Sequence, residues 1–184
     1  CGVGLHDVLR ARAHDLYGII NGVDYSIWNP ETDKHIAATY NSVDLSGKAR
    51  CKAALQEMNG LPVQNKPLIG IVSRLDKQKG FDILSDAIHE IMRMDVQMVL
   101  LGTGDAKYHA LFEEMAIRHP SKIGVNLTFD NAMAHQIEAG ADVLDVNVGF
   151  PGVDDETLLP ETVIAIQEAF DIPLCIDSPN PKAI

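Results

Sequence analysis

The stretch Leu68–Met92, LIGIVSRLDKQKGFDILSDAIHEIM, decides the fold that this sequence predicts. Its first five residues, 68–72, are apolar and partly β-branched, as in a buried parallel strand. A polar loop that carries Arg74 and Lys79 follows. From Phe81 onward the apolar residues recur at helical spacing. Residues 68–92 therefore predict one strand–loop–helix unit of an α/β protein.

The same alternation continues to the end of the chain. Four further strands are predicted, at 96–101, 123–129, 143–148 and 173–176. With the helices between them, they predict a three-layer, Rossmann-like α/β domain with a five-stranded, mainly parallel sheet. Right-handed crossovers would bring the loops that follow the strands to one edge of the sheet, where α/β proteins bind ligands.

The beginning of the chain lacks a clear strand pattern. We expect residues 1–62 to form a partly helical N-terminal extension and residues 63–184 to form the Rossmann-like domain. The first residue is not Met, and the last residues, NPKAI, resemble the opening of a helix. These features suggest a piece of a longer protein.

Composition narrows the class of protein. A hydrophobic fraction of 46% and a charged fraction of 22% are ordinary for a soluble globular domain. No apolar run approaches the roughly 20 residues of a membrane span, and no signal peptide opens the chain. The three cysteines are far apart and show no metal-ligand spacing, which predicts reduced thiols in a cytoplasmic protein.

Charge is distributed unevenly along the chain. No Lys or Arg occurs in residues 123–181, although this stretch contains 11 of the 26 Asp and Glu residues. Without cations to neutralise phosphates, it is not predicted to bind nucleic acid. So abrupt a change is unusual within one compact domain and suggests that two sequences of different origin meet near residue 140.

Two loops at the predicted ligand edge have open interpretations. Arg74 and Lys79, with the N-terminus of the following helix, can bind an anion, or they can simply keep a solvated loop soluble. Gly102 and Gly104 can let the backbone approach a ligand, or they can form a tight turn before a helix capped by Asp105. Walker A, GxGxxG, HExxH, CxxC and GxSxG motifs are absent from the sequence.

Polar residues also lie near the ends of the last two predicted strands. Asn147 and Asp177 can hydrogen-bond a flat heterocycle that has several N–H groups. Alternatively, Asp177 caps the next helix and Asn147 satisfies a loop.

Residues 1 to about 142 closely resemble bacterial-type glycogen (starch) synthases that use ADP-glucose. The stretches that carry this resemblance are CGVGLHDVLR, GIINGVDYSIWNPETD, VSRLDKQKGFDIL, VLLGTGD and HQIEAGAD. The family consists of two-lobed GT-B glycosyltransferases that hold the nucleotide mainly in the C-terminal, Rossmann-like lobe. The resemblance implies that the chain spans the end of the first lobe and the first half of the second.

The resemblance also implies roles for single residues. Arg74 and Lys79 match the catalytic pair that binds the distal phosphate of ADP and stabilises the departing diphosphate. Asn21 matches an active-site asparagine near the sugar, and Phe129 falls where an aromatic residue stacks on the adenine. Gly102 and Gly104 lie in a loop that faces the nucleotide. The implied ligands are ADP or ADP-glucose, with α-glucan as a partner and no required cofactor.

Beyond residue 142 the synthase resemblance stops. Where that family has a SRFEPCGL-type segment, this chain reads VLDVNVGFPGVDDETLLPETVIAIQEAFDIPLCIDSPNPKAI. Residues 138–184 resemble the pterin-binding (βα)8-barrel domain of methyltetrahydrofolate:corrinoid methyltransferases, which are relatives of dihydropteroate synthase. Asp177 matches the aspartate that binds the pterin ring in that family, and Asn147 sits in its strand-end motif. This second resemblance implies methyltetrahydrofolate as a ligand.

The sequence therefore predicts a chimera with a seam near residues 138–143. The first hypothesis is a fragment of an ADP-glucose-dependent glycogen synthase that binds nucleotide sugar without turnover. The second is a pterin-binding methyltransferase fragment, and the third is a structural chimera with no activity.

Overall fold

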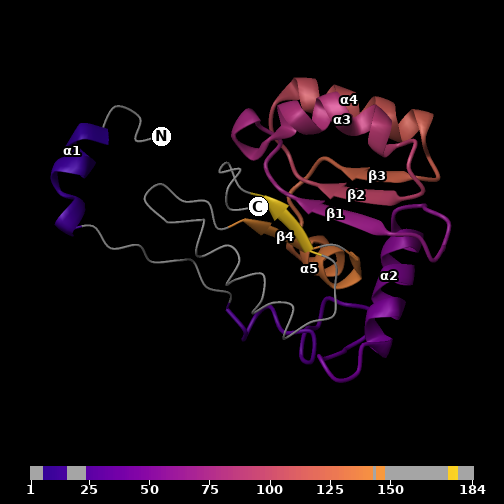
Figure 1. Ribbon diagram of the computed structural model, residues 1–184. Helices are drawn as coiled ribbons and strands as arrows, with labels where there is room; N and C mark the ends of the chain where they lie inside the picture. Colours follow the sequence, from indigo (N-terminus) through magenta and orange to yellow (C-terminus); the bar gives the residue numbers. More distant parts are fainter. Residues whose placement is uncertain (1–5, 16–23, 143, 148–173, 178–184) are drawn as a thin grey trace. The chain divides into compact units, whose positions relative to one another are not determined.

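The computed structural model describes residues 6–15, 24–142, 144–147 and 174–177 (Figure 1). Two compact units divide the chain. The larger unit is Tyr25–Leu144, and the other consists of Cys1–Asp24 together with Asp145–Ile184. None of the described helices is both long and apolar enough to cross a lipid bilayer.

A three-stranded parallel sheet forms the centre of the larger unit. Its strands are β1 (Leu68–Val72), β2 (Gln97–Leu101) and β3 (Ile123–Asn126), in the order β1-β2-β3. All five residues of β2 are buried. A central strand covered on both faces does not alternate between apolar and polar residues, so β2 continues as MVLL after Gln97, whose buried side chain is hydrogen-bonded to Gln56.

Two pairs of helices cover the sheet and make three layers (Figure 1). On one face lie α3 (Phe81–Ile91) and α4 (Ala106–Arg118), whose core includes Phe112 together with Met98 and Leu100 of β2. On the other face lie α2 (Ser46–Met58) and α5 (Asn131–Gly140), which pack with Val99 and Leu101 of the same strand. Successive residues of β2 thus pack into the cores on opposite faces of the sheet, because side chains alternate between the two faces along a strand.

The prediction of one five-stranded sheet is wrong for the strands that the structure describes. All five strands occur close to their predicted positions, but β4 (Leu144–Asn147) and β5 (Leu174–Asp177) form a separate two-stranded sheet.

Asp142 is hydrogen-bonded to the first residue of β1. Its Oδ2 accepts the N–H of Leu68 (2.7 Å), its own N–H donates to the Leu68 carbonyl (3.0 Å), and Lys52 Nζ lies 2.7 Å from the same carboxylate oxygen. A side chain therefore takes up backbone hydrogen bonding at the start of β1. The periodicity of apolar residues does not predict such a contact between a side chain and the backbone of a strand.

The rest of the described chain includes segments N-terminal to the sheet. In the smaller unit, α1 (His6–Ala11) is followed by the short 3-10 helix η1 (Ala13–Asp15). In the larger unit, α2 packs against α5 although it precedes the boundary predicted at residues 62 and 63. That boundary stays a prediction. The helix expected between the last two predicted strands lies outside the described residues.

Candidate functional site

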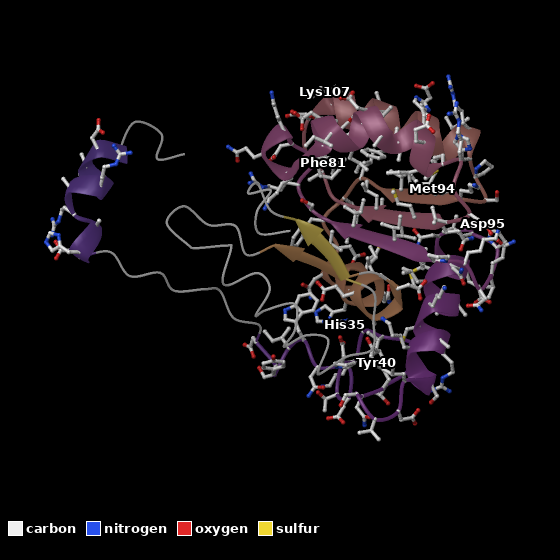
Figure 2. The ribbon with its side chains drawn as sticks, viewed as in Figure 1. His35, Tyr40, Phe81, Met94, Asp95 and Lys107 are labelled. Carbon is white, nitrogen blue, oxygen red and sulfur yellow. The ribbon has the colours of Figure 1, made fainter. Side chains whose placement is uncertain are left out.

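Three loops of the larger unit meet the carboxyl edge of the parallel sheet, because each follows a strand of the same direction. They are residues 73–80 after β1, 102–105 after β2 and 127–130 after β3. Figure 2 shows Phe81 and Lys107, near the beginnings of α3 and α4, at one end of the helical layer, and Met94 at the other. The first turns of both helices therefore border this edge.

Backbone hydrogen bonds join the first two loops beyond the ends of their strands. The Ser73 N–H donates to the Leu101 carbonyl (3.1 Å). Leu75 is held on both sides, since its N–H donates to the Thr103 carbonyl (3.0 Å) and its carbonyl accepts the N–H of Asp105 (2.9 Å). Its side chain is fully buried. These hydrogen bonds hold residues 73–80, the basic loop, on residues 102–105, the glycine loop, at a point next to Arg74.

The two glycines permit this close approach. A Cβ on Gly102 would lie 1.8 Å from the Ser73 carbonyl oxygen, and one on Gly104 would lie 2.2 Å from the Leu75 carbonyl oxygen. The close contact between the two loops by itself explains why positions 102 and 104 are glycine. Asp105 occupies the N-cap position of α4, but its side chain makes no capping hydrogen bond.

Asp76 organises the two basic residues that the sequence singles out. Its Oδ1 accepts the backbone N–H of Lys79 (3.1 Å), which closes the 3-10 turn η2 (Lys77–Lys79). Its Oδ2 lies 3.5 Å from Arg74 Nη1. Gly80 then adopts a left-handed conformation with φ 72° and leads into α3 without a side-chain cap. Arg74, Lys79 and the uncapped start of α3 are consequently grouped along one short loop.

The basic side chains of this loop face solvent. The Arg74 side chain is 70% exposed, and its contact with Asp76 is one that solvent screens strongly. Lys79 is exposed and makes no ion pair with any residue that the structure describes. Both cations can therefore turn toward an incoming anion at little cost.

Phe129 lies at the same edge, between β3 and α5, with 90% of its surface exposed. It precedes Asp130, whose Oδ1 caps α5 by accepting the N–H of Met133 (3.0 Å). β3 ends at Asn126, three residues earlier than the sequence predicts. An aromatic ring so exposed can stack on a planar ligand.

The other predicted site residues lie outside the part of the chain whose side chains the structure describes. Asn21 lies outside the described residues. Asn147 and Asp177 are the last residues of β4 and β5, as expected for strand ends, but their side chains lie outside the described part. No group of three or more His, Cys, Asp or Glu residues in the described part could hold a metal ion.

A buried polar cluster between residues 28–35 and α5 had no signal in the sequence. His135 Nδ1 lies 2.6 Å from Asp33 Oδ2, and the two side chains are only 1% and 7% exposed. The ring of Trp28 stacks on His135 with centroids 3.7 Å apart. Nε2 of His135 is buried and has no hydrogen-bond partner among the described residues. The contacts attach the chain that precedes α2 to α5.

Comparison with known proteins identifies relatives over much of the chain. No protein-family model matches the sequence. Glycogen synthase 1 of Geobacter metallireducens is 54% identical over 142 residues, which are 77% of this chain and 28% of that protein. Glycogen synthase 1 of Geobacter sulfurreducens is 51% identical over the same length. Glycogen synthase of Anaeromyxobacter dehalogenans is 48% identical over 143 residues, 77% of this chain and 30% of that protein.

A solved structure shows the same relationship. The catalytic domain of starch synthase IV from Arabidopsis thaliana, bound to ADP and acarbose, matches with a TM-score of 0.72 and 34% identity. The match covers 79% of this chain and 30% of that chain. The chain thus spans less than a third of the length of these relatives. Over 77% of its residues it is homologous to bacterial glycogen synthases, and it has an α/β fold similar to part of a starch synthase catalytic domain.

Proposed function

We propose that this chain is a nucleotide-binding fragment of an ADP-glucose-dependent glycogen (starch) synthase, and that Arg74 and Lys79 bind the diphosphate of the nucleotide. The observation that carries the proposal is the exposed basic loop at the carboxyl edge of the sheet, in a chain homologous to glycogen synthases. The related starch synthase IV structure contains ADP.

The geometry of the loop suits a diphosphate. Asp76 contacts the Arg74 side chain and the Lys79 backbone, so it sets the relative positions of the two cations. The start of α3, which has no side-chain cap at Gly80, adds the positive end of a helix dipole. Arginine can bind two phosphate oxygens at once, whereas lysine contributes a compact charge.

The remaining roles follow from the same proposal. The exposed ring of Phe129 would stack on the adenine, and Asn21 would lie near the sugar. Gly102 and Gly104 would face the nucleotide as part of the loop that supports Leu75. α-Glucan would be the acceptor in the whole enzyme, with no cofactor required. We propose that the 184-residue chain alone binds nucleotide without turnover, because it spans only 28–30% of its relatives.

The pterin-binding hypothesis for residues 138–184 stays a prediction. The relatives described above are glycogen and starch synthases and give it no support. The contacts of Asn147 and Asp177 with methyltetrahydrofolate would involve side chains outside the described residues.

Calorimetric titration with ADP tests the proposed function. We expect measurable binding, and we expect Arg74→Ala to weaken it by roughly tenfold or more, since a hydrogen bond to a charged group contributes about 1.5–3 kcal/mol. Arg93→Ala is the matched control, because Arg93 is also exposed but lies just beyond the other end of α3. Equal ADP affinity of the wild type and Arg74→Ala would refute the role of Arg74.

A further inference from the structure

His109 makes a contact that the proposed function does not use. It lies in the first turn of α4, five residues after Gly104. Its Nε2 accepts a hydrogen bond from the Gly104 N–H (3.0 Å) and lies 3.4 Å from Thr103 Oγ1. Since Nε2 accepts, the ring of the neutral side chain carries its proton on Nδ1. A side chain of α4 therefore holds the backbone at the centre of the glycine loop.

The two residues on either side of Gly104 hold the basic loop. The carbonyl of Thr103 and the N–H of Asp105 bond the two backbone groups of Leu75 at 3.0 and 2.9 Å. There is little free space at this contact, because a Cβ on Gly104 would lie 2.2 Å from the Leu75 carbonyl oxygen. A shift of Gly104 would therefore displace Leu75. Arg74 immediately precedes Leu75 in the sequence.

We propose that His109 is a positioning residue for Arg74, and that it acts through Gly104 and Leu75. The importance of this role for ligand binding rests on the proposed nucleotide function. The Gly104 N–H is committed to His109, so the glycine loop supports the basic loop rather than donating that N–H to the ligand. This arrangement places the positive charge of Arg74 before the nucleotide arrives, which lowers the cost of ordering the loop on binding.

Three substitutions of His109 separate the effect of its hydrogen bond from the effect of its side-chain volume. His109→Gln keeps an acceptor at about the reach of Nε2, His109→Asn holds its acceptor one methylene group shorter, and His109→Ala has none. We expect His109→Ala and His109→Asn to raise the Kd for ADP by about three- to tenfold, as the loss of one hydrogen bond predicts. We expect His109→Gln to restore the Kd to within about twofold of wild type. His89→Ala, at an exposed position on α3, should leave it unchanged.

Amide hydrogen exchange measured by NMR without ADP provides an independent readout on the full chain. The amides of Gly104 and Leu75 should exchange faster in His109→Ala than in the wild type and recover in His109→Gln. Faster exchange at Gly104 alone, with Leu75 and the Kd for ADP unchanged, would overturn the connection to Arg74. Should the wild type fail to bind ADP, the proposed function fails, and the two amides then decide the inference by themselves.

Discussion

Removal of the Asp33 carboxylate should destabilise the larger unit substantially. Asp33 Oδ2 lies 2.6 Å from His135 Nδ1, and both side chains are almost completely buried. Asp33→Ala leaves that nitrogen without its partner, and Nε2 already has none among the described residues. Breaking a buried pair on one side costs about 3–5 kcal/mol in other proteins, because the remaining group is desolvated without compensation.

The nearby carboxyl group of Glu138 should keep the loss of stability in Asp33→Ala at the lower end of that range. This carboxyl group lies one turn after His135 on α5, where partial burial raises its pKa while its interaction with His135 opposes the rise. It can therefore compensate in part for the lost charge of Asp33. We expect Asp33→Ala to lower the free energy of unfolding by about 3 kcal/mol. For a domain with a typical stability of about 5–15 kcal/mol, this is a large fraction.

Urea denaturation followed by tryptophan fluorescence measures this loss directly, because Trp28 is the only tryptophan of the chain and stacks on His135. Asp33→Asn should cost less than Asp33→Ala, since its amide oxygen can still accept from Nδ1. Glu113→Ala removes an exposed carboxylate from the middle of α4 and should change the stability by less than about 0.5 kcal/mol. A loss below about 1 kcal/mol for Asp33→Ala would refute the view that this pair holds residues 28–35 on α5.

Two further predictions concern the larger unit. The pKa of Tyr40 is raised from 10.0 to about 12, first by burial and then by the charges of Cys51, Glu138 and Asp33. The neutral form of Tyr40 therefore stabilises the fold below pH 10, and this contribution is lost as the pH rises toward 12. Unfolding measured at pH 9 and pH 12 should show a smaller loss of stability in Tyr40→Phe than in the wild type, and an equal loss would contradict the assignment. Gly104→Ala should lower the free energy of unfolding by about 1–3 kcal/mol, because the new methyl group would meet the Leu75 carbonyl. Thermal denaturation checks this, and an unchanged melting temperature would show that the two loops separate easily.

The proposed site combines features that differ in how far the sequence predicts them. Strand direction alone places Arg74, Gly102 and Phe129 at one edge, because each follows a parallel strand. The role of Asp76 as the residue that contacts both Arg74 and Lys79 was not predicted, since it depends on the 3-10 turn that precedes α3. The acceptor role of His109 depends likewise on the path of a loop. Single histidines without a motif carry no such signal.

Local sequence determined the order and position of the secondary structure. The apolar run at 68–72 became β1 at those residues, and α3 and α4 begin at Phe81 and Ala106 as expected. A short apolar run and a helical period are properties of neighbouring residues, so they can be identified without knowledge of the fold. The resemblance of residues 1 to about 142 to glycogen synthases was also present in the sequence, and the relatives match over 142 or 143 residues.

Tertiary structure alone decided which of these elements meet. The five strands divide into two sheets, and Leu68 bonds the side chain of Asp142, 74 residues away. His135, which belongs to no sequence motif, is buried against Trp28 and Asp33 from more than 100 residues earlier. Periodicity indicates which face of an element is buried, but not what buries it. The partner depends on contacts between distant residues, and these are set only when the chain packs.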